Sequence, residues 1–301
     1  SLVLAFATIY LVWGSTYLAI RVAVADVPPF LMAGLRFTAA GGLLYLFLRG
    51  RGVPAPPARQ WRHQAVGGLL ALVGGNALTC WAEQTVPSGL TSLIVGGSPL
   101  ILILIERIRP GGPRPTPGLL AGVAVGLLGL ALLLGPGAFP HGSRPPWRSV
   151  AALVCAATCW WSGSLYSKHV GHAGHGLMSA ALQMLVGAAG MFGVALALGE
   201  PARFHPRAVP AVAWGAIIYL IVAGSLVAYP TYLWLLRHCA PSRVATYAYV
   251  NPLIAVILGW ALLGEPLTPR IAVSAAIIVA AVAIITAQKP GNPNPPKTDP
   301  A

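Results

Sequence analysis

The stretch "VPSGLTSLIVGGSPLILILIE" at residues 86–106 occurs again, in altered form, as "APSRVATYAYVNPLIAVIL" at residues 240–258. Each copy has a Pro-Ser pair near its start and a second proline, Pro99 or Pro252, inside an apolar run. The first prolines are 154 residues apart and the second prolines are 153 residues apart. Nearly equal separations at both ends of the segment indicate that the chain contains an internal duplication.

The composition predicts that both copies lie in a membrane. The chain has 301 residues, of which 56% are hydrophobic and 8% are charged, and its mean hydropathy is +0.75. This balance is far from that of soluble domains. Apolar stretches long enough to cross about 30 Å of hydrocarbon recur without polar alternation, so they predict helices rather than barrel strands. We expect an all-α integral membrane protein with ten spans, at about 2–24, 30–48, 65–85, 88–105, 118–134, 150–168, 177–198, 211–236, 242–263 and 271–287.

The duplication divides these spans into two units of five helices. The first unit is predicted at residues 1–137 and the second at residues 138–287, followed by a polar, proline-rich tail at 288–301 that we expect to be disordered. Because five is an odd number of crossings, the second unit enters the membrane the opposite way up. Inverted repeats of this kind surround a substrate site near the membrane midplane in many transporters. We therefore expect two inverted five-helix repeats around a central cavity.

The net charge of +13 is spread unevenly over the predicted loops. If the N-terminus is cytoplasmic, twelve of the nineteen Lys and Arg residues fall in cytoplasmic segments, six fall outside, and Arg36 lies within a span. An excess of basic residues is typical of cytoplasmic loops. The pattern thus predicts that both termini are cytoplasmic, and it assigns the basic charge to membrane topology rather than to nucleic-acid binding.

Several longer motifs resemble those of a known family. They are "VWGSTYLAIRVA" at 12–23, "LMAGLRFTAAGGLL" at 31–44, "EQTVPSGLTSLIVGGSPL" at 83–100 and "YVNPLIAVILGWALLGEPLTP" at 249–269. Their order and the ten-span layout resemble the drug/metabolite transporter superfamily, specifically ten-helix EamA-type exporters, over essentially the whole chain. Among these the chain is most similar to bacterial exporters of amino acids and other small metabolites. The resemblance implies a transporter of the bacterial inner membrane.

Polar and aromatic side chains are predicted to meet where the two repeats face each other. Aromatic walls with a few hydroxyls and amides suit a small amphipathic solute. An alternative is that some of the aromatic residues belong to the interfacial belts of the membrane. The predicted solute-binding residues are Trp13, Ser15, Thr16, Asn76, Thr79, Glu83, Ser98, Trp161, Ser164, Tyr229, Tyr232, Tyr247 and Asn251.

Three prolines within spans are predicted to kink helices beside the cavity: Pro99, Pro230 and Pro252. A proline inside a membrane helix leaves a carbonyl without its usual donor, which is tolerated only against protein or water. The competing interpretation is that these kinks serve packing alone.

Two charged residues need individual interpretation. Arg36 lies inside the second span, and we favour a structural role, paired with Glu83 or with helix-end carbonyls, over a role in attracting a carboxylate solute. Glu83 either contacts a solute ammonium or ends the third span in water. Of the six acidic residues only Glu83 offers a carboxylate for proton coupling, and it lies at the edge of its span. This predicts facilitated export rather than proton antiport.

No cofactor, metal or disulfide is expected. The four cysteines fall in or beside apolar helices, and His169, His172 and His175 lack a nearby acid or cysteine to complete a metal site. Small residues at Gly118, Gly122 and Gly126 and at Ala272, Ala276 and Ala280 predict close packing of the fifth and tenth spans. We expect a monomer in the lipid bilayer, although a homodimer would use the same small-residue faces.

Other functions compete with export of small metabolites. A lipid or polyprenyl-carrier translocase is compatible with the same fold, and Arg36 is its sole basic candidate within a span. An intramembrane enzyme is less favoured, because the sequence contains no H-E-x-x-H motif, no pair of membrane aspartates and no serine-nucleophile motif. The prediction is therefore a non-enzymatic exporter of small amphipathic metabolites, with amino acids foremost, that works by alternating access.

Overall fold

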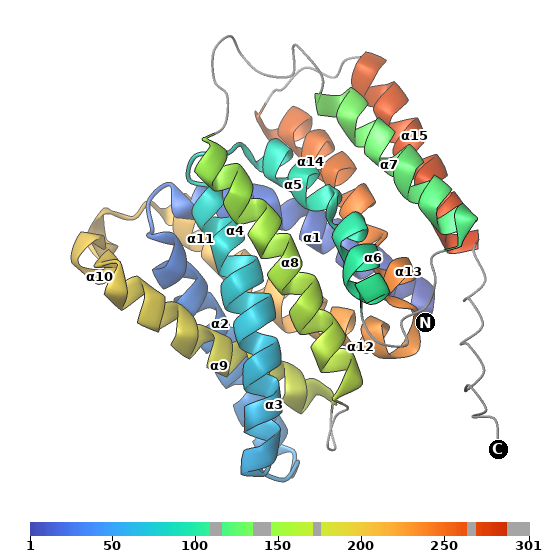
Figure 1. Ribbon diagram of the computed structural model, residues 1–301. Coiled ribbons are helices and arrows are strands. Elements are labelled where there is room, and N and C mark those ends of the chain that lie inside the picture. The colour runs from blue at the N-terminus through green and yellow to red at the C-terminus, as the bar shows by residue number, and fades with distance from the viewer. Residues whose placement is uncertain (109–115, 135–145, 171–175, 264–268, 288–301) are drawn as a thin grey trace, which may run out of the picture.

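The computed structural model describes residues 1–108, 116–134, 146–170, 176–263 and 269–287, and all regular structure within these ranges is helical. The predicted tail at 288–301 lies outside them. The elements of the first half are α1 (Leu2–Val24), α2 (Pro29–Gly50), α3 (Ala58–Gly68), the π-helix η1 (Leu69–Ala77), α4 (Leu78–Ala82), α5 (Ser88–Gly96), α6 (Ser98–Ile108) and α7 (Pro117–Leu134). Figure 1 shows them from blue to green.

The second half has the same order of long and broken helices. Its elements are α8 (Trp147–His169), α9 (Gly176–Ala197), α10 (Glu200–Arg203), the 3-10 turn η2 (Pro206–Ala208), α11 (Ala211–Tyr219), the π-helix η3 (Leu220–Ala228), α12 (Tyr229–His238), α13 (Pro241–Val244), α14 (Tyr247–Leu263) and α15 (Pro269–Ala287).

The all-helical membrane class is confirmed. Seven helical passages in the described ranges are long and apolar enough to cross a membrane. Three shorter apolar stretches, Ile94–Ile103, Pro117–Gly129 and Ala272–Ile285, lie where three further spans are expected. The count of ten spans and the inversion of the second repeat stay predictions.

The two copies of the duplicated segment fold differently in detail. In the first copy the helix is interrupted at Gly97, and Pro99 is the second residue of α6. A proline costs little there, because the N–H of the first helical turn has no partner within the helix. In the second copy α14 continues through Pro252. The repeated prolines thus occupy a helix start in one copy and a helix interior in the other.

Two π-helices interrupt the third and eighth predicted spans at corresponding places. Both η1 and η3 have nine residues, and η3 begins 151 positions after η1. Pro230 is the second residue of α12, directly after η3. It lacks the N–H that an α-helix would direct to the carbonyl of Leu226, which favours a wider turn at that point. Short π-segments are often found at functional sites, and both of these border the cavity described below.

Helix α1 contacts elements of the second half of the chain, namely α14, α11, η3 and α12. Elsewhere, α2 packs against α9, α8 packs against η1, and α7 packs against α15 at the outer edge (Figure 1). A Cβ at Gly122 of α7 would lie 2.7 Å from Cγ1 of Ile285, so the glycine permits the close contact with α15. The expected packing of these two helices is observed.

A buried acid organises one end of the α2–α9 pair. Helix α2 starts at Pro29 and has no side-chain cap of its own. The Glu200 carboxylate accepts hydrogen bonds from the backbone N–H groups of Leu31, at 2.7 Å, and Phe30, at 3.4 Å. A carboxylate at a helix N-terminus is favourable because that end has unpaired N–H donors and a positive dipole.

Candidate functional site

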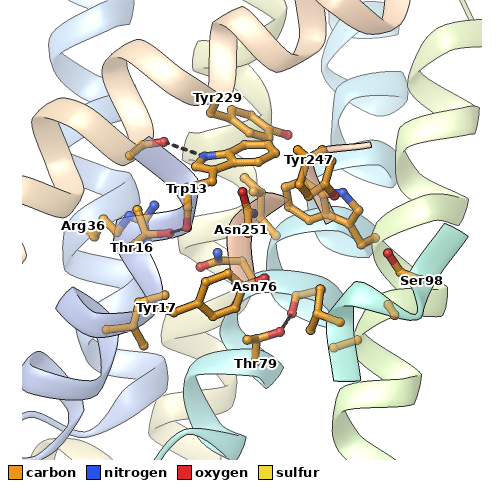
Figure 2. A pocket seen from close by; sticks show the side chains of 18 of the residues that line it. Trp13, Thr16, Tyr17, Arg36, Asn76, Thr79, Ser98, Tyr229, Tyr247 and Asn251 are labelled. Carbon is orange, nitrogen blue, oxygen red and sulfur yellow. Dashed lines mark hydrogen bonds between the residues drawn. The ribbon is translucent and has the colours of Figure 1, made fainter. Parts of the chain in front are cut away.

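A cavity lies at the centre of the helices and is lined from both halves of the chain (Figure 2). The space that the centre of a water-sized sphere can occupy is about 80 Å³, which is enough for several water molecules. The lining residues are Trp13, Thr16, Tyr17, Ile20, Arg36, Phe37, Leu72, Gly75, Asn76, Thr79, Val95, Ser98, Ala156, Ala157, Trp160, Gly224, Tyr229, Tyr247 and Asn251.

Aromatic rings form one wall of the cavity, and Trp13 contacts two other rings of this wall and a third, Tyr232, behind it. Its ring centroid is 4.8 Å from that of Tyr232, 5.1 Å from that of Tyr247 and 5.4 Å from that of Trp160. The contacts with Tyr247 and Trp160 are edge to face, an arrangement that the ring quadrupoles favour. The Trp13 Nε1–H donates to the carbonyl of Gly224 at 3.4 Å. This wall can hold the apolar part of a solute.

The polar lining residues differ in how far their own neighbours satisfy them. The hydroxyls of Thr16 and Thr79 donate to backbone carbonyls of Trp13 and Gly75, each at 2.8 Å. The Asn251 amide, oriented as its neighbours require, donates to the carbonyls of Tyr247 at 3.0 Å and Tyr10 at 3.3 Å. The Tyr17 hydroxyl is also hydrogen-bonded to the Asn251 side chain.

The Ser98 hydroxyl, by contrast, is buried and has no partner in the described part of the chain. Ser98 and Asn251, the paired residues that precede the repeated prolines, thus both border the cavity.

Eight of the thirteen predicted solute-binding residues line the cavity: Trp13, Thr16, Asn76, Thr79, Ser98, Tyr229, Tyr247 and Asn251. The other five lie outside the lining. Tyr232 and Ser164 form a layer behind the aromatic wall, where the Tyr232 hydroxyl donates to Ser164 Oγ at 2.7 Å. Ser15 bonds the hydroxyl of Tyr219 and the carbonyl of Val12 instead.

Trp161, which the sequence predicted to bind solute, lies outside the lining, and its neighbour Trp160 lies in it. Trp161 is 0% exposed and stacks on Tyr247 with ring centroids 6.3 Å apart, so it belongs to the core. Trp160 lines the cavity. Successive residues of a helix point about 100° apart, so one tryptophan of the pair faces the cavity and the other does not. Tyr17, which sequence reasoning also missed, lies one turn after Trp13, and its four-residue spacing was the available signal.

Glu83 lies beyond the lining, fully buried directly after α4. Neither carboxylate oxygen has a hydrogen-bond partner within the described ranges. The guanidinium of Arg21 bonds the Glu83 backbone carbonyl rather than the carboxylate. Glu83 therefore does not end its helix in water, one of the two roles considered from the sequence. Burial without a partner favours the neutral acid.

Arg36 reaches the cavity from α2 and is 2% exposed. Arg36 does not form the expected pair with Glu83. Both carboxylate oxygens of Glu83 are without a hydrogen-bond partner in the described ranges. Instead Arg36 Nε donates to Ser225 Oγ in η3 at 2.7 Å, and the guanidinium carbon lies 4.7 Å from the ring centroid of Phe37. The wider turns of η3 thus supply the partner of the buried charge.

The residues considered for metal binding are only partly described by the structure. His172 and His175 lie outside the described residues, and within those ranges no group of three His, Cys, Asp or Glu side chains could hold a metal ion. The four cysteines are free thiols.

Apolar helices around a cavity lined from both halves of the chain are typical of membrane transporters. The chain belongs to the EamA-like transporter family, which matches residues 1–135 and 147–287. This confirms the resemblance seen in the sequence. The division into two five-helix repeats at residues 1–137 and 138–287 stays a prediction.

Full-length relatives agree with this assignment. The chain is 36% identical over 282 residues to the "Uncharacterized inner membrane transporter YedA" of Escherichia coli (strain K12), covering 93% of this chain and 89% of that protein. It is 26% identical over 278 residues to the "Probable terminal-alkyne amino-acid exporter" of Streptantibioticus cattleyicolor, covering 91% and 89%. A crystal structure described only as that of a protein matches with a TM-score of 0.74 and 25% identity, covering 94% of this chain and 96% of the other.

Proposed function

We propose that the protein exports small amphipathic metabolites, amino acids foremost, across the bacterial inner membrane by alternating access of the central cavity. The observation that carries the proposal is the cavity itself, with an aromatic wall and a few polar groups contributed by both halves of the chain. A mixed lining of this kind binds the apolar part of a solute and orients its polar part. A cytoplasmic location of both termini is part of the proposal.

Two relatives support the finer points. One is named as an inner membrane transporter and another as an amino-acid exporter. Transfer of the second property is a proposal, because that relative is 26% identical. The solute gradient is the proposed driving force, since the cavity residues include no carboxylate among those that the structure describes.

Transport by purified protein in proteoliposomes tests the proposal. We expect labelled phenylalanine or leucine to move down its concentration gradient, and charged amino acids to move at least about tenfold more slowly, because an apolar wall discriminates against them. Imposing a pH gradient should not change the rate. Movement of a fluorescent phospholipid between leaflets, with no amino-acid flux, would instead favour the translocase interpretation.

Replacing Glu83 with glutamine tests whether export is independent of proton movement. Because the buried acid is expected to be neutral, Glu83→Gln preserves its charge and nearly its shape. We expect the phenylalanine flux to stay within about twofold of wild type, with and without a pH gradient. The exposed Asp26→Asn variant is the control. If a flux component driven by the pH gradient exists and disappears in Glu83→Gln, export is coupled to protons at Glu83.

A further inference from the structure

A buried guanidinium borders the cavity without a carboxylate partner. Arg36 Nε is satisfied by Ser225 Oγ, whereas Arg36 Nη1 is buried and has no hydrogen-bond partner in the described ranges. The buried acids lie elsewhere: both Glu83 oxygens are unpaired, and Glu200 caps α2. A charged side chain inside a membrane span ordinarily faces another charge, a polar cavity or a ligand.

The surroundings of Arg36 favour an anion. Among the described residues that line the cavity, Arg36 alone carries a formal charge. Space beside the guanidinium depends on Gly224, where a Cβ would lie 2.8 Å from Arg36 Nη2 and 3.2 Å from Thr16 Cγ2. Figure 2 shows Arg36 on the same side of the cavity as Thr16. The end of the guanidinium is therefore not covered by a side chain from η3 at this position.

We propose that Arg36 binds the carboxylate of the transported solute and that the aromatic wall holds its apolar part. This inference rests on the proposed function, in which the central cavity carries the solute. Since Nε is already bonded to Ser225, the two terminal nitrogens form the free edge of the guanidinium, and two parallel N–H donors match the two oxygens of a carboxylate. A single cation in the lining suits a monocarboxylate better than a phosphate ester, which carries more charge.

The test compares an acid with its amide on the purified full-length protein. The probes are 3-phenylpropanoate and 3-phenylpropanamide, which share the aromatic ring and differ in charge, and binding is measured by the rise of the thermal melting midpoint in detergent. We expect wild type to bind the acid at least about tenfold more tightly than the amide. Arg36→Gln should lose this preference, and Arg36→Lys should retain part of it because it keeps the charge but not the fork. The exposed Arg49→Gln variant, on the same helix, should behave as wild type.

A second variant keeps the test decisive if Arg36→Gln does not fold. Gly224→Ala places a methyl group against Nη2, so it should weaken acid binding more than amide binding and reduce the acid preference. Gly215→Ala on the adjoining α11, where a Cβ meets nothing within 4 Å, is the matched control.

Equal binding of acid and amide by wild type, a preference that survives in Arg36→Gln, or no binding of the acid would each overturn the inference. Labelled phenylalanine flux, measured in parallel, separates this inference from the proposed function. Flux without acid preference leaves export standing and removes Arg36 as the anchor. Acid binding that depends on Arg36, without phenylalanine flux, would leave Arg36 standing as the anchor and would contradict the proposed export.

Discussion

Replacing Trp160 with alanine is expected to lower phenylalanine flux in proteoliposomes at least about tenfold while leaving the protein folded. Trp160 lines the cavity and contacts Trp13 and Tyr232, with ring centroids 5.4 Å and 5.3 Å apart. Loss of one well-packed aromatic contact with a solute corresponds to about 1.4–2.8 kcal/mol, which is roughly a 10- to 100-fold change. The protein itself loses less, because this side chain already borders open space.

The neighbouring Trp161→Ala variant provides the contrast. Trp161 is 0% exposed, and removal of a core tryptophan typically costs about 3–5 kcal/mol of stability. We expect a markedly lower melting midpoint and a loss of folded protein in size-exclusion chromatography. Trp147→Ala, at a site that is 74% exposed, should leave both flux and stability near wild type. Unchanged flux in Trp160→Ala, with Trp161→Ala stable and inactive, would reverse the assignment of the two side chains.

Gly163→Ala is expected to destabilise the protein more than Gly224→Ala or Gly215→Ala does. A Cβ at Gly163 of α8 would lie 2.7 Å from the backbone nitrogen of Ala71 and 3.0 Å from the carbonyl oxygen of Gly67. Backbone atoms cannot rotate away as a side chain can, so α8 and η1 must separate. Overpacking of this kind costs about 1–3 kcal/mol or more.

The measurement for Gly163 is the thermal melting midpoint in detergent, which we expect to fall by about 2–5 °C. Gly215→Ala adds the same methyl group in open space and should change the midpoint little. Equal midpoints for the two variants would show that α8 and η1 do not approach each other as closely as the structure indicates.

Hydropathy located the helices well because the free energy of transfer into lipid is a property of each segment alone. The predicted spans at 2–24 and 211–236 agree closely with α1 and with the continuous helix from α11 to α12. The third span starts earlier than expected, at Ala58 rather than near residue 65. The polar stretch "ARQWRHQ" at 58–64 gives no apolar signal, yet the helical hydrogen bonds continue through it.

The cavity residues were predictable in part. Helical spacing placed Trp13, Thr16, Asn76 and Asn251 on the inner faces of their helices. It did not resolve the adjacent tryptophans of α8, because both orientations of that helix present one large ring inward. The two π-helices were not predicted either. Pro230 follows η3, but no proline marks η1, so the sequence offers no shared signal for the pair.

The sequence by itself determined that this protein is an all-helical membrane transporter of the EamA-like family and that its chain contains two related segments. These properties depend on local composition and on order along the chain. Only the tertiary structure decided that Ser225, 189 residues away from Arg36, accepts its hydrogen bond, and that the Glu83 carboxylate is buried without a hydrogen-bond partner among the described residues. The physical reason is that a buried polar group can bond only to atoms that helix packing brings within about 3 Å. Which atoms these are depends on both packed segments together and cannot be read from either one alone.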